Sequence, residues 1–381
     1  MRYSLRFAVA FAALSFAFAS VAMAQDAQTI RNIFESAPKT PTSVGNVRIF
    51  AGPPAGFNAL TATGEELAEY GLPQRPDKAT QPEQFAAWTR AMSALKYQAT
   101  DVKALATHNE PNRPLNKPSA GAAVSNVPTT TSSGNWSGVA NTNKLTKWNK
   151  LTSFDYIASS FVVPSAQPPF NACANGITGP FLVSIWNGID GFDNGDVVQG
   201  GTQGYSNCTP ADTSYIAWVE WYPSYPELEI VCGSSACPVV PGDTMFVVTY
   251  GTAGTAEQTV FVENVSREWY GTFGLPYVTG PGVVGSSEEQ IVERPCCNGS
   301  DLYALNNYDY GYFAGAYGYD VHGTLFYAGE QTATTYLLDM YDDAGTEIIS
   351  EVIEQGSLGN AGKYMLWFSD AECAYSGGCT P

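Results

Sequence analysis

Histidine is nearly absent from this sequence, which has only His108 and His322 among its 381 residues. A Ser-His-Asp or Cys-His nucleophilic site needs a histidine base, and a histidine-ligated zinc site needs two or three. After Pro128 only His322 remains, in an aromatic run where a histidine is more often packed or exposed than catalytic. Asp-Thr-Gly and Asp-Ser-Gly sequences, which would indicate a catalytic aspartate pair, are also absent. Any chemistry must therefore use carboxylates, carboxamides and tyrosines, and we expect no metal and no cofactor.

Basic residues are scarce in the second part of the chain. Of the 18 Lys and Arg residues, two precede Gln25, ten lie between Gln25 and Pro128, and six follow. Of the 36 Asp and Glu residues, nine lie between Gln25 and Pro128 and 27 follow, so the part from Thr129 carries a formal charge of −21. This excludes nucleic acids as partners, because they bind basic patches. The self-repulsion fades as carboxylates protonate, which suits acidic surroundings, although solubility or salt tolerance would explain the charge equally well.

Long apolar runs are confined to the start of the chain. Residues 1–24 combine a basic start, a short alanine-rich apolar block and the ending Ala22-Met23-Ala24, the pattern of a cleaved secretory signal peptide. No later run approaches the length of a transmembrane helix. We therefore expect a secreted, extracellular protein with no membrane partner, and a monomer.

The eight cysteines all lie after Pro128, and none form a Cys-x-x-Cys pair, which disfavours zinc and redox sites. In an exported chain they predict up to four disulfides. The expected partners are Cys232 with Cys237, Cys173 with Cys208, and the adjacent Cys296 and Cys297 with Cys373 and Cys379.

Residues 25–128 are predicted to be a pro-segment that ends in a linker. Apolar residues at the spacing of an amphipathic helix occur at Phe85, Trp88, Met92 and Leu95. After Leu105 the chain becomes polar and proline-rich up to Pro128, and Thr129–Gly134 follows as a run of Thr, Ser and Gly. This composition is typical of exposed, easily cut linkers. The alternative interpretation is a separate N-terminal binding domain.

The part from residue 129 to residue 381 consists of short β-branched and aromatic runs separated by Gly, Pro, Asn and Asp, with no helical period. Regularly spaced strands with turn signals predict an all-β domain, an antiparallel β-sandwich of two large sheets of the concanavalin-like or jelly-roll type. About 250 residues suffice for one such domain.

Three segments carry the candidate functional groups. Trp186–Gly201 holds an aromatic and a carboxylate and reaches Gln199 after a short apolar run, among glycines that let a ligand approach the backbone. In Tyr215–Tyr222, strand alternation puts Trp218, Glu220 and Tyr222 on one face. The same alternation in Ser287–Glu293 groups Glu289, Ile291 and Glu293 opposite Glu288, Gln290 and Val292. Either face of that last segment could be solvated, and a charge run by itself favours solvation.

These segments, taken with others, resemble one family. In order along the chain stand Asn135-Trp136-Ser-Gly138, Phe161-Val-Val-Pro164, Trp186-Asn-Gly-Ile-Asp190-Gly, Val198-Gln199-Gly-Gly, Ala217-Trp218-Val-Glu220-Trp-Tyr-Pro223, Pro241-Gly-Asp243 and Glu289-Gln-Ile-Val-Glu293. Each motif is weak, but seven in this order resemble the eqolisins, the acid-acting glutamic peptidases. The resemblance implies a sandwich of two antiparallel sheets and a catalytic glutamine–glutamate pair, Gln199 and Glu289. It places Trp186, Asp190, Trp218 and Glu220 as supporting or substrate-binding residues.

The resemblance also implies protein or peptide substrates and a pepstatin-insensitive endopeptidase. We expect the pro-segment to act as an intramolecular inhibitor that covers the site and is released in acid, with the cut between about Asn126 and Gly134. Two other functions stay open: a sandwich-fold glycoside hydrolase that uses Glu220 and Glu289 as its carboxylate pair, and a secreted binding module without catalysis.

Overall fold

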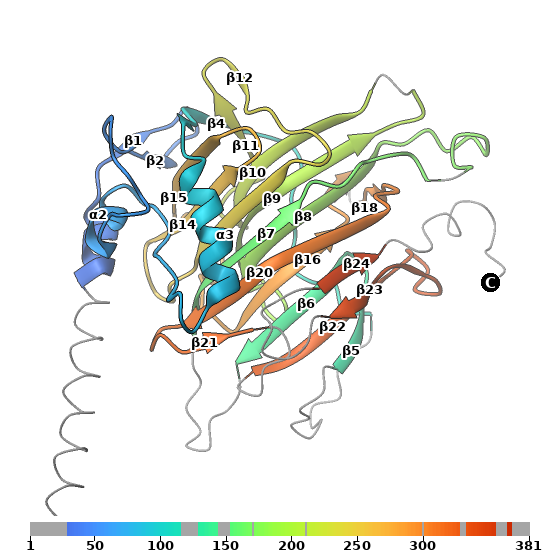
Figure 1. The fold of residues 1–381 in the computed structure, drawn as a ribbon. Helices are drawn as coiled ribbons and strands as arrows, with labels where there is room; N and C mark the ends of the chain where they lie inside the picture. The colour runs from blue at the N-terminus through green and yellow to red at the C-terminus, as the bar shows by residue number, and fades with distance from the viewer. Residues whose placement is uncertain are drawn as a thin grey trace, which may run out of the picture.

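A computed structural model describes residues 29–115, 129–143, 153–169, 171–209, 212–298, 301–327, 333–355 and 364–367. The predicted signal peptide, most of the predicted linker, Cys373 and Cys379 lie outside these ranges. No helix among the described residues is long and apolar enough to cross a membrane. Two large, mainly antiparallel sheets pack against each other (Figure 1), so the predicted β-sandwich is confirmed.

Sheet 1 carries all three candidate segments. Its strands follow the order β4 (Asp101–Ala104), β11 (Leu228–Cys232), β10 (Ser214–Tyr222), β9 (Val197–Ser206), β8 (Phe181–Ile189), β16 (Ser287–Glu293), β6 (Trp136–Asn143), β22 (Ala333–Tyr341) and β5 (Thr129–Ser133). Short β12 (Ser235–Ala236) pairs with β11, and β19 (Ala304–Leu305) pairs with β8.

Sheet 2 packs against sheet 1. The order is β1 (Lys39–Pro41), β2 (Arg48–Phe50), β15 (Trp269–Pro276), β14 (Glu257–Asn264), β13 (Thr244–Tyr250), β7 (Phe154–Val162), β20 (Tyr310–Asp320), β24 (Tyr364–Trp367) and β23 (Ile348–Gln355). Short β3 (Tyr97–Gln98) pairs with β15 and β21 (Leu325–Phe326) with β20, while β23 also pairs with β22 and links the two sheets. A separate hairpin joins β17 (Cys296–Asn298) to β18 (Asp301–Leu302).

Strand alternation decides which residues form the core between the sheets. Val198, Val219 and Val292 of sheet 1 belong to one buried cluster with Val247 and Val262 of sheet 2. Their neighbours in sequence therefore point to the outer faces of the sandwich. On sheet 1 this outer face carries Gln199, Glu220 and Glu289.

The N-terminal segment is built into the sandwich. Helix α2 (Gly64–Glu69) begins with a capping box between Thr63 and Glu66, and α3 (Pro82–Ser93) begins with proline, which suits the first helical turn. Figure 1 shows α3 across the outer face of sheet 2. Its Trp88 and Met92 share a buried cluster with residues of that sheet such as Phe246 and Phe261, so the predicted amphipathic helix is confirmed.

Strands from the same N-terminal segment extend both sheets. β2 pairs with the edge strand β15 of sheet 2, and β4 pairs with β11 of sheet 1. These pairings, and the shared cluster under α3, contradict the alternative of a separate N-terminal binding domain.

Two sequence-based expectations were wrong in detail. Residues 129–133 form strand β5, parallel to β22, instead of a linker, and Ser133 is buried. Cys173–Cys208 and Cys232–Cys237 are bonded as predicted, but Cys296 and Cys297 are bonded to each other. The Thr/Ser composition of residues 129–133 predicted a linker. Backbone hydrogen bonds, which any side chain allows, hold these residues in β5 instead.

Candidate active site

Four neighbouring strands of sheet 1 bring the candidate residues into one row. Glu220 pairs with Gln199, Gln199 with Gly188, and Gly188 with Glu289. Directly paired residues of antiparallel strands project to the same face, so the three side chains share the outer face. A Cβ on Gly188 would lie 3.1 Å from the Gln199 Cβ and 2.9 Å from the Trp186 ring. The glycine therefore keeps the space between Gln199 and Glu289 free of side-chain atoms.

Two tryptophans, Trp218 and Trp186, lie beside the row, one on β10 and one on β8. Trp218 and Trp186 lie on either side of Gly201, and both are fully buried. The Trp186 indole donates to Glu293 Oε2 over 3.0 Å, and its ring meets that of Trp136 edge to face, with centroids 5.0 Å apart. Rigid indoles at these positions restrict where Glu293 can lie.

Asp190 has a different task from the others. Its backbone has φ +70°, and its carboxylate accepts backbone hydrogen bonds from Val284, Gly285 and Ser286 at 2.6–3.0 Å. These contacts join the loop after β8 to the chain that leads into β16. Asp190 is therefore a positioning residue for the strand that carries Glu289.

A strap of the N-terminal segment, defined here as residues 107–113, crosses this row. The Gln199 amide donates to the carbonyl of Asn109 over 2.7 Å, and the Asn109 N–H donates to Glu220 Oε2 over 2.9 Å. The next N–H, of Glu110, donates to Glu293 Oε1 over 2.9 Å. The row thus binds the backbone of a peptide.

Both ends of the strap are held as well. The Glu227 N–H donates to the Thr107 carbonyl, and His108 exchanges two backbone hydrogen bonds with Cys296. Further along, the Trp136 indole donates to the Glu110 carbonyl, and the Asn112 N–H donates to Gly191. The strap is therefore an extended peptide bound across the outer face of sheet 1.

Burial under this cover sets the charge of the site. Burial raises the pKa of Glu289 well above its usual range, and the nearby Asp190 and Glu288 add to the rise, while the Ser287 hydroxyl opposes it. No described residue donates to either oxygen of the Glu289 carboxyl within hydrogen-bond distance. Burial raises the pKa of Glu220 to about 7, against the opposing effects of His108 and the Asn109 N–H. With the strap bound, Glu289 is a neutral acid at acidic pH.

Sequence reasoning missed several residues of this arrangement. Glu293 shares the strand face of Glu289, and that alternation was the signal for it. The carboxyl of Glu227 and the strap residues His108 and Asn109 had no such signal. The strap contributes mainly backbone atoms, which leave no pattern in side-chain chemistry. His322 is exposed in the turn after β20, away from the row.

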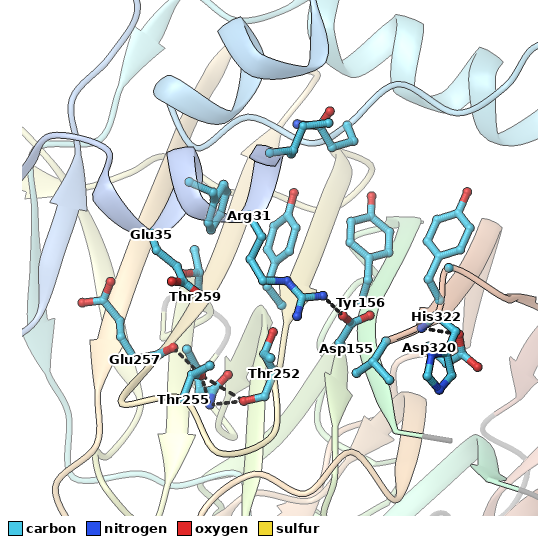
Figure 2. Close-up of a pocket in the computed structure, with 18 of the residues that line it drawn as sticks. Arg31, Glu35, Asp155, Tyr156, Thr252, Thr255, Glu257, Thr259, Asp320 and His322 are labelled. Carbon is cyan, nitrogen blue, oxygen red and sulfur yellow. Dashed lines mark hydrogen bonds and ion pairs between the residues drawn. The ribbon is translucent and has the colours of Figure 1, made fainter. Parts of the chain in front are cut away.

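A cavity of about 1110 Å³ lies elsewhere, between the N-terminal segment and the outer face of sheet 2. Figure 2 shows Arg31 reaching Asp155 there, at 2.8 Å, with Tyr156 and His322 nearby. Its walls come from the N-terminal segment and the sandwich together, so it is a feature of their contact. Among the described residues, Glu110, Cys296 and Cys297 stand close enough to share a metal ion. The two cysteines are bonded to each other, and disulfide sulfurs do not act as thiolate ligands.

The model of the peptidase A4 family matches residues 134–357, more than half of the chain. Scytalido-glutamic peptidase, solved with a transition state analog inhibitor, is similar at 16% identity and TM-score 0.48, covering 62% of this chain and 98% of that chain. SCP-B, an eqolisin in complex with the tripeptide Ala-Ile-His, is similar at 15% identity and TM-score 0.44, with 62% and 98% covered.

Aspergilloglutamic peptidase from Aspergillus niger is similar at 21% identity and TM-score 0.40, covering 50% of this chain and 99% of that chain. No curated protein sequence matches the chain. The family match confirms the resemblance to the eqolisins that the ordered motifs indicated. It spans every strand that contributes to the row, from β8 to β16. The chain therefore belongs to the peptidase A4 family.

Proposed function

We propose that the chain is a secreted, acid-acting endopeptidase in which Gln199 and Glu289 activate water against a peptide carbonyl. One observation carries the proposal: the Gln199 amide already donates to a peptide carbonyl, that of Asn109. Glu289 lies two strands from Gln199 at the same register, with only Gly188 between them.

The chemistry follows from these two groups. Ionised Glu289 takes a proton from a water molecule, and the resulting hydroxide attacks the scissile carbonyl carbon. The Gln199 N–H stabilises the oxyanion that forms. As the carbon–nitrogen bond breaks, protonated Glu289 returns its proton to the leaving amine. Glutamine does not titrate, so the pair avoids the repulsion that separates the pKa values of two carboxyl groups.

Glu220 binds the backbone N–H of the residue that carries the scissile carbonyl, and Glu293 binds the N–H of the scissile bond itself. Their partners in the strap are the successive N–H groups of Asn109 and Glu110. We assign both as substrate-binding residues, with Trp186 keeping Glu293 in place. A carboxyl accepts a hydrogen bond in both protonation states, so this binding persists in acid.

We further propose that the chain is made as a latent precursor and that the strap inhibits it. Acid weakens two contacts of the N-terminal segment. His108 Nδ1 lies 3.5 Å from Glu220 Oε1, and that attraction fades as the pH falls below the pKa of Glu220, about 7. Burial raises the pKa of Asp155 to about 6, so its ion pair with Arg31 is lost below that pH.

Acid treatment of the precursor is expected to create a new N-terminus between Asn126 and Thr129. The sequence composition alone allows a cut as late as Gly134, but β5 pairing and the buried Ser133 protect residues 129–133 from cleavage. N-terminal sequencing after incubation at pH 4 and at pH 7 measures this. A cut elsewhere, or equal processing at both pH values, would contradict the proposed maturation.

The acid-matured enzyme is expected to digest a denatured protein in acid, in the presence of pepstatin, across a pH 2–7 series. Gln199→Ala should lower kcat by about 10²–10³, the usual effect of removing one oxyanion donor. A glycoside hydrolase would instead hydrolyse polysaccharides, and that activity would survive Gln199→Ala and be lost in Glu220→Gln. Wild-type protein that binds peptides without cleaving them would support the binding module.

A further inference from the structure

We infer that the active site contains a polar subsite, formed by Glu227 and Gln203, that selects peptides with asparagine or glutamine immediately before the scissile bond. This inference rests on the proposed function, because it takes the carbonyl bound by Gln199 as the position of the scissile carbonyl. It adds the substrate class to that function.

The strap fixes which side chain enters the subsite. Because Gln199 binds the carbonyl of Asn109, the side chain of Asn109 stands where the residue before the scissile bond would stand. Asn109 is fully buried, and its Nδ2 donates to Glu227 Oε1 over 3.3 Å. The strap thus shows one side chain that the subsite accepts.

The subsite is built from buried polar groups. Glu227, just before β11, is fully buried, and Gln203 on β9 is 7% exposed. With its amide turned to donate, Gln203 lies 3.2 Å from both carboxyl oxygens of Glu227. The hydroxyl of Thr107 donates to the second of those oxygens. The other oxygen faces the amide of Asn109.

The chemistry of Glu227 decides which side chains fit. Burial raises its pKa to about 8, and the nearby Glu220 and Glu229 add to the rise, while Thr107 and Asn109 oppose it. At acidic pH the group is a neutral carboxylic acid with one donor and two acceptor atoms, which matches a carboxamide. An apolar side chain would leave buried polar atoms without partners and lose affinity.

The groove continues past the subsite on the N-terminal side of the bound peptide. A cavity of about 320 Å³ is lined by Thr107 of the strap, by residues just before the strap, and by sheet 1 residues such as Gln203, Ile216 and Glu229. A substrate that follows the strap therefore has room for residues that precede the selected side chain.

The test compares two peptides that differ only in the residue before the cleaved bond, asparagine in one and leucine in the other. The acid-matured enzyme is assayed at pH 4, and kcat/KM is measured for both peptides. We expect the asparagine peptide to be preferred at least about tenfold, the effect of one unpaired buried polar group. Glu227→Gln should keep the preference, since an amide also donates and accepts. Glu227→Met should reduce it to about twofold or reverse it.

If Glu227→Met does not fold, Gln203→Met can be used in its place. It is also expected to weaken the preference for asparagine over leucine. Equal kcat/KM values for both peptides with wild-type enzyme would overturn the inference and leave the proposed mechanism intact. So would a preference that survives both methionine variants. Cleavage of neither peptide would overturn the proposed mechanism and this inference together.

Discussion

Glu289→Gln is expected to lower kcat for peptide hydrolysis by at least about 10³, the loss of a general base and proton donor in one substitution. Beneath the strap the Glu289 side chain is a neutral carboxylic acid, because burial raises its pKa. Glutamine has the same size and shape as that neutral acid. The variant should therefore fold and bind peptides like the wild type. Only the capacity to take and return a proton is removed.

The neighbouring residue provides a matched control. Glu288 is equally buried, but strand alternation points it to the inside of the sandwich, where its carboxyl accepts from Asn141 Nδ2 over 3.0 Å. Glu288→Gln makes the same chemical change one residue away. We expect it to leave kcat within about threefold of wild type, because residues that do not touch the reacting atoms rarely affect the chemical step.

The comparison needs matured protein from both variants. Tagged wild-type enzyme can process each precursor in acid and then be removed, so that self-maturation is not required. Hydrolysis of one peptide at pH 4 then gives kcat and KM. Loss of activity in both variants, or in neither, would mean that Glu289 is not the base.

Glu288→Gln is also expected to increase the free energy of unfolding at pH 7, by roughly 3 kcal/mol. Burial raises the pKa of Glu288 in the folded chain to about 8 from the ordinary 4.5. Between these two values the folded chain holds a proton that the unfolded chain has released. The stabilisation is complete below pH 4.5, falls as the pH rises, and is lost by about pH 8. Glutamine does not titrate, so the variant loses no stability at this position as the pH rises.

Urea unfolding of the precursor at pH 4.5 and pH 7 measures the effect. Both proteins should carry Glu289→Gln, so that self-digestion in acid does not interfere. The two proteins should differ little at pH 4.5, and the one with Glu288→Gln should be more stable at pH 7. Glu65→Gln, on the exposed surface of α2, is the control and should change neither value. Equal pH dependence with and without Glu288→Gln would show that Glu288 does not titrate as its burial implies.

The parts of the site that follow strand alternation could be predicted from the sequence. Side chains two apart share a face, so Trp218 with Glu220 and Glu289 with Glu293 were grouped correctly. The choice of face for Ser287–Glu293 needed the structure, because both faces hold carboxyl groups. Here Glu288 lies between the sheets and Glu289 on the outer face, and both are fully buried.

Long-range backbone pairing could not be predicted. β5 pairs with β22, roughly 200 residues later, and the strap meets Glu220 and Glu293 across more than 100 residues. Hydrogen bonds of the main chain are available to nearly every residue, so composition gives no sign of them. For the same reason the composition of the polar, proline-rich segment around Asn109 predicted a linker.

The edge pairings of the N-terminal segment affect how long the folded enzyme lasts. β2 and β4 are synthesised first, yet their partners β15 and β11 follow more than 100 residues later. Such distant contacts make folding slow, because a long loop must close before they form. Under the proposed maturation, a cleaved molecule that unfolds lacks two of the strands with which it first folded. The lifetime of the mature enzyme is then governed by its rate of unfolding and not by an equilibrium with the unfolded chain.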